Sequence, residues 1–71
     1  MNQDKLVRTI GKNLRKVRLS KGLTQLELAE KTGLNVSHYA RIERGETTPN
    51  IFTLGLLVKA LKVQASDILP F

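Results

Sequence analysis

The chain has 71 residues, 41% hydrophobic and 4% aromatic, which is room for one small domain with an aliphatic core. Its 12 lysines and arginines against 6 acidic residues give a net charge of +6, which favours an anionic partner, either nucleic acid or an acidic membrane face. The absence of cysteine excludes disulfides and thiolate metal sites, and a single histidine argues against a zinc site. No apolar run has the length of a membrane span or of a signal peptide, so we expect a cytoplasmic protein.

The basic charge is confined to the first part of the chain. Residues 1–21 contain seven lysines and arginines against Asp4 alone, whereas residues 22–71 contain five basic and five acidic residues. A helix is predicted over about 4–20, because apolar residues recur there at spacings of four, four and three. These residues are Leu6, Ile10, Leu14 and Val17. The basic residues lie mainly on the other faces of this helix.

A second, short helix is predicted over about 25–32. Thr24 and Glu27 have the spacing of a capping box, in which the hydroxyl and the carboxylate each bind a backbone amide of the first turn. Gly33 ends the helix, since a glycine tolerates the positive φ that such an end requires.

A third helix is predicted over about 36–44, with Asn35 as its cap, Tyr39 and Ile42 facing inward and Gly45 as the stop. We expect the Tyr39 hydroxyl to reach the surface. Two further helices are predicted over about 51–62, capped by Asn50, and about 65–69, anchored by Ile68 and Leu69. Since no segment alternates with period two, the fold is predicted to be all-α, with five short helices in a single domain over 1–71.

The pair of helices within about 24–44, joined by Gly33-Leu34-Asn35, has the form of a helix-turn-helix, whose second helix enters the DNA major groove. Several motifs occur here in order. They are Leu23-Thr24-Gln25-x-x-Leu28-Ala29, Gly33-Leu34, Ile42-Glu43-Arg44-Gly45 and Pro49. With these motifs the chain resembles the Cro/C1-type helix-turn-helix family of phage repressors, restriction–modification controllers and antitoxins. The resemblance implies a compact five-helix bundle of the lambda-repressor-like type and a bacterial or phage transcriptional regulator, acting at the nucleoid on double-stranded DNA.

The resemblance also assigns roles to individual residues. Val36, Ser37 and Arg41 match positions that read base edges, and Arg41 suits guanine. Contacts to phosphates are expected from a larger set, which positions the protein without reading sequence. That set is Thr24, Gln25, Asn35, His38, Arg44, Thr47 and Thr48. Arg18 and Glu43 match an internal salt bridge. Arg15, Lys16 and Lys21 remain ambiguous between DNA contact and plain surface charge.

Leu26, Phe52 and Leu56 are apolar where the family usually has polar residues. Phe52 and Leu56 share a helix face, and Ile68, Leu69 and Phe71 are expected to extend it into one exposed apolar patch. We therefore expect a homodimer through Phe52, Leu56, Leu69 and Phe71, placing two reading helices on a pseudo-palindromic operator. A plain cover over a small core is the alternative.

Catalysis is not expected, because no nucleophile–base arrangement and no glycine-rich phosphate loop is present, and no metal, cofactor or small-molecule ligand is implied. Two other functions stay open at this point. One is an antitoxin that represses its own operon. The other is a membrane-surface or protein-binding module using the basic first helix, which however lacks a Trp or Phe to anchor it in lipid.

Overall fold

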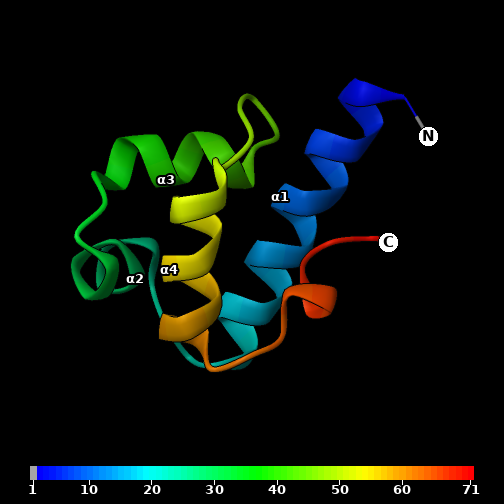
Figure 1. Ribbon diagram of the computed structural model, residues 1–71. Helices are drawn as coiled ribbons and strands as arrows, with labels where there is room; N and C mark the ends of the chain where they lie inside the picture. Colours follow the sequence, from blue (N-terminus) through cyan, green and yellow to red (C-terminus); the bar gives the residue numbers. More distant parts are fainter. Residues whose placement is uncertain (1) are drawn as a thin grey trace.

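The computed structural model describes residues 2–71, which contain four α-helices, a short 3₁₀ helix and no strand (Figure 1). The helices are α1 (Gln3–Ser20), α2 (Gln25–Thr32), α3 (Val36–Glu43) and α4 (Ile51–Leu61), followed by the 3₁₀ helix Ala65–Asp67. The prediction of an all-α fold is confirmed. The prediction of five helices is wrong, because the last segment forms a single 3₁₀ turn.

The ends of the helices explain the differences from the predicted bounds. The Asn2 side chain caps α1, so this helix begins one residue earlier than expected. Arg44 and Lys62 are caps rather than members of α3 and α4, and Lys62 takes a left-handed conformation with φ of 56°. The final segment lies between the cap at Gln64 and Pro70, a residue that disfavours helical backbone just before it, which leaves too little chain for a full α-helix.

The core is aliphatic around one aromatic ring, as the composition indicates. α1 and α2 both pack against α3, and α2 also packs against α4. The C-terminal segment runs beside α1 (Figure 1), where the Asn13 side chain donates to the Ile68 carbonyl at 2.8 Å. The buried hydrophobic residues are Ile10, Leu14, Leu28, Ala29, Tyr39, Ile42, Leu54, Leu57, Leu61 and Ile68. Ile68 is therefore part of the core, and its predicted place in an exposed patch is wrong.

Gly11 lets α1 approach the end of α3 closely. A Cβ atom at this position would lie 2.5 Å from the carbonyl oxygens of Ile42 and Glu43. No side chain fits there without movement of one helix. This contact fixes where α3, and so its exposed face, stands on the molecule.

Candidate nucleic-acid interface

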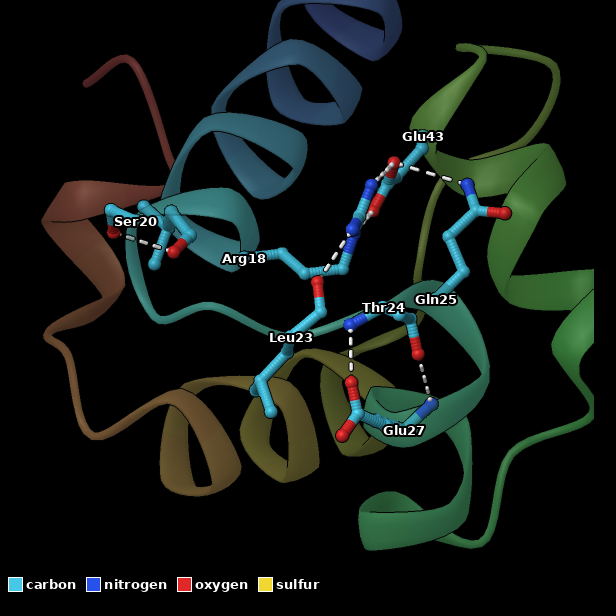
Figure 2. Close-up of polar contacts among 8 residues, drawn as sticks. Arg18, Ser20, Leu23, Thr24, Gln25, Glu27 and Glu43 are labelled. Atoms are coloured by element: carbon cyan, nitrogen blue, oxygen red, sulfur yellow. Dashed lines mark hydrogen bonds and ion pairs between the residues drawn. The ribbon is translucent and has the colours of Figure 1, made fainter.

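The N-terminus of α2 is formed by the predicted capping box. The Thr24 hydroxyl accepts from the Glu27 amide at 3.0 Å, and the Glu27 carboxylate accepts from the Thr24 amide at 2.8 Å (Figure 2). The hydrogen bond from the Thr24 amide to the carboxylate is the main cause that lowers the pKa of Glu27. The Thr24 side chain is exposed, so this end of α2 is open to an external partner.

The turn between α2 and α3 presents the second helix. Gly33 has φ of 74°, in the left-handed region that favours glycine. Asn35 then caps α3, its side-chain oxygen accepting from the amides of Ser37 and His38 at 2.9 and 3.1 Å. Since that oxygen is committed to the cap, only the amide NH₂ of Asn35 can serve an external acceptor.

The three expected base-reading residues lie on α3 with Ser37 and Arg41 exposed and Val36 half-buried. Their spacing of one and five residues places them along one side of the helix. The residues expected at phosphates come from the N-terminus of α2, from the cap and first turn of α3, and from the chain after α3. Thr24, Asn35, His38, Arg44 and Thr48 are exposed, and Gln25 and Thr47 are half-buried.

One open depression joins three of these elements. Thr24 and Gln25 of α2 line it together with Val36 of α3 and with Arg44, and Arg15 of α1 lines it as well. The start of α2 and the start of α3 therefore face a common surface, and Arg15, which the sequence left ambiguous, belongs to it. Leu19 and Leu26 also line the depression, and both are more than half exposed.

Behind this surface lies the buried ion pair that was predicted between Arg18 and Glu43 (Figure 2). Arg18 Nε and Nη2 donate to the two carboxylate oxygens of Glu43 at 2.6 and 3.0 Å, and Arg18 Nη1 donates to the Leu23 carbonyl at 2.7 Å. Gln25 Nε2 donates to Glu43 Oε1 at 3.1 Å, which the sequence did not predict. Burial by itself raises the pKa of Glu43, but the contacts of the carboxylate with Arg18, Tyr39 and Gln25 outweigh burial and hold that pKa below its ordinary value. The pair thus ties α1, α2 and α3 together.

Tyr39 differs from its prediction. Its side chain is fully buried, and its hydroxyl does not reach the surface. That hydroxyl makes no hydrogen bond of good geometry within residues 2–71, although it lies close to the Arg18–Glu43 pair. Burial and the neighbouring Glu43 carboxylate raise the pKa of Tyr39, so the phenol stays neutral at physiological pH.

A second charged group was missed by sequence reasoning and lies on the surface itself. The Glu46 carboxylate accepts from Arg44 Nε at 2.5 Å, and Glu46 Oε1 lies 3.6 Å from Arg41 Nε. One expected base-reading residue and one expected phosphate-contacting residue are therefore paired with the same acid. The only feature of the sequence that points to this ion pair is the short separation of Arg41 and Glu46, five residues, with the turn residue Gly45 between them.

α4 and the C-terminus also expose large apolar side chains. Phe52 and Phe71 are each 82% exposed, Ile51 is 75% exposed and Leu56 is 45% exposed, while Leu69 is half-buried. Ile51 was not foreseen as part of this set. Residues 2–71 hold no cluster of three or more His, Asp or Glu suited to a metal ion. Within the same range, no helix has the length and apolar character to cross a membrane.

Comparisons with known proteins show to which family this fold belongs. The HTH_3 helix-turn-helix family model matches residues 14–68. The immunity repressor of Bacillus phage phi105 is 40% identical over 60 residues, which is 84% of this chain and 42% of the repressor, so the chain spans less than half of that relative. An uncharacterised HTH-type transcriptional regulator of Sinorhizobium fredii is 37% identical over 54 residues, covering 76% of this chain and 70% of the regulator. The restriction–modification controller C.AhdI of Aeromonas hydrophila superposes with a TM-score of 0.83 at 33% identity, over 90% of this chain and 96% of the controller.

Proposed function

The chain belongs to the HTH_3 helix-turn-helix family of transcription regulators, and on that premise we propose that it is a homodimeric repressor or controller that reads a pseudo-palindromic operator in double-stranded DNA. One observation carries the proposal most directly. The start of α3, at Val36, and the capped N-terminus of α2, at Thr24 and Gln25, line one open depression, and Ser37 and Arg41 are exposed on the same α3. A helix fits the major groove, and a helix N-terminus attracts phosphate.

In this function, base contacts and phosphate contacts come from different residues. Arg41 pairs with guanine through O6 and N7, and Val36 packs on a thymine methyl group. Thr24, Gln25 and Arg44 grip phosphates and set the orientation of α3. The protein acts at the nucleoid in the cytoplasm and needs no cofactor for binding.

Dimerisation supplies the second half of the site. The apolar set formed by Ile51, Phe52, Leu56 and Phe71 is exposed in the single chain and suits a symmetric contact between two copies. Two α3 helices about 34–36 Å apart then enter successive major grooves.

A direct test compares binding to labelled duplex DNA and to anionic phospholipid vesicles across a salt series. DNA binding predicts anisotropy changes with duplex that weaken steeply with salt, and weak or no binding to vesicles. Gln25→Ala lowers the affinity for all duplexes alike, because it removes a contact that carries no sequence information. Vesicle binding without duplex binding would instead establish the basic face of α1 as a membrane-binding helix and overturn the proposal.

A further inference from the structure

The turn after α3 holds an acidic residue in a fixed place beside the DNA-facing arginines. Gly45 has φ of 76°, and its amide donates to the Ile42 carbonyl at 3.1 Å. The next amide, that of Glu46, donates to the Arg41 carbonyl at 3.0 Å. This paired closure is the Schellman motif, which leaves the turn little freedom. The turn also packs on α1, since a Cβ at Gly45 would lie 2.9 Å from Arg8 Cα.

The side chain of Glu46 uses this position to engage both arginines. Its two carboxylate oxygens accept from Arg44 Nε at 2.5 Å and Nη2 at 3.4 Å, and Oε1 lies 3.6 Å from Arg41 Nε. All three side chains are about half exposed, between 48% and 56%. The hydrogen bond from Arg44 is the main cause that lowers the pKa of Glu46, so the carboxylate is ionised at neutral pH.

Building on the proposed DNA-binding function, we propose that Glu46 is an internal competitor for DNA, which holds Arg41 and Arg44 until phosphate and guanine displace it. The chemistry of the two ligands is alike, because a guanidinium offers the same planar fork of donors to a carboxylate and to a phosphate. In the complex the displaced carboxylate remains close to the phosphates, since the turn cannot carry it away. Glu46 therefore weakens binding to every sequence.

The proposal is tested with Glu46→Gln, which keeps the shape of the side chain and removes its charge. We expect the variant to bind duplex DNA about two- to fivefold more tightly than the parent, the size typical of an exposed ion pair. The slope of log affinity against log salt should steepen by up to about 0.9, the contribution of one phosphate. Glu30→Gln is the matched control, because Glu30 is an exposed acid of α2 that makes no ion pair within residues 2–71, and its loss changes the net charge equally.

A cycle with Arg44→Ala separates competition from simple repulsion. If Glu46 acts by holding the arginines, the gain from Glu46→Gln becomes smaller when Arg44 is already absent, because only Arg41, at 3.6 Å, is left to hold. If the gain keeps its full size in the Arg44→Ala background, or if Glu30→Gln gives the same gain, the carboxylate only repels DNA and competition is refuted.

The DNA-free protein gives an independent readout. The ¹⁵Nε–¹H resonance of Arg44 should shift on Glu46→Gln and stay in place on Glu30→Gln, and an unmoved resonance would overturn the ion pair. Failure of the proposal is distinguishable from failure of the proposed function. If the parent binds duplex DNA and Glu46→Gln matches it, competition alone is refuted, whereas a parent that binds no duplex refutes both.

Discussion

At the scale of single residues, the buried pair of Arg18 and Glu43 is the contact whose removal we expect to cost most. The Arg18 and Glu43 side chains are 8% and 3% exposed, so Arg18→Met leaves a carboxylate buried without its main partner. We expect a loss of about 3–5 kcal/mol in the free energy of unfolding. Urea denaturation followed by circular dichroism measures it.

The double variant Arg18→Met/Glu43→Leu is the control for this prediction. It removes both charges, so most of the lost stability should return, since an apolar pair of similar volume is often tolerated at such sites. A double variant as unstable as Arg18→Met would show that the arginine stabilises the fold through its bond to Leu23 rather than through Glu43.

The residue scale also shows where sequence reasoning reached the site and where it stopped. The caps at Thr24 and Asn35 were predictable, because capping depends on neighbours within three residues. The bond from Gln25 to Glu43 joins residues 18 positions apart, and only the packing of α2 on α3 brings them together. The buried hydroxyl of Tyr39 was missed for the same reason, since burial depends on what covers the residue.

At the scale of elements, the close contact of α1 with the end of α3 at Gly11 fixes the position of α3, the helix that we propose reads DNA. Replacing a glycine inside a helix by alanine ordinarily stabilises it by about 0.5–1 kcal/mol. At Gly11 the added Cβ would instead meet backbone carbonyls at 2.5 Å. We therefore expect Gly11→Ala to lose about 1–3 kcal/mol, as overpacked sites do, and to weaken DNA binding by displacing α3.

Thermal unfolding and duplex binding of Gly11→Ala measure the two effects. Lys12→Ala is the neighbouring control, because Lys12 is exposed on the same helix and its truncation should change stability little. A Gly11→Ala variant more stable than the parent would contradict the close approach of the two helices.

The elements themselves were largely predictable from local signals. The bounds of α2 follow from a capping box at one end and a glycine at the other, both visible in the sequence. The last segment was not predictable as a 3₁₀ turn from its apolar residues alone, because Ile68 and Leu69 suit either structure. The contact at Gly11 gave no sequence signal, since a glycine within a helix does not reveal what lies opposite.

At the scale of the whole molecule, the net charge of +6 does not come from the proposed DNA-reading segment. Residues 24–48 carry three basic and four acidic residues, a net of −1. Arg18, from α1, neutralises Glu43 inside the fold, and Glu46 offsets part of the positive charge of Arg41 and Arg44 at the surface. The proposal of DNA binding therefore rests on the geometry of α2 and α3 and on their caps, and we expect the excess charge of α1 only to attract DNA from a distance.

The oligomeric state is the second property of the whole molecule. We expect Phe52→Glu to convert a dimer into a folded monomer, because Phe52 is 82% exposed and contributes little to the core of one chain. Sedimentation equilibrium measures the mass. Leu26→Glu is the matched control, since Leu26 is an exposed apolar residue on α2 outside the proposed apolar dimer contact, and its replacement should leave the dimer intact. A parent protein that sediments as a monomer would contradict the proposed interface.

The central claim is that α3 reads DNA through Arg41. It is tested most directly by selecting bound sequences from a random duplex pool with the parent and with Arg41→Ala. The parent should enrich an inverted repeat whose half-sites lie about one helical turn apart or a multiple of it, and Arg41→Ala should lose the preference for one guanine in each half-site. A pool without any enriched motif, or the same motif from Arg41→Ala, would contradict the assignment of α3 as the reading helix.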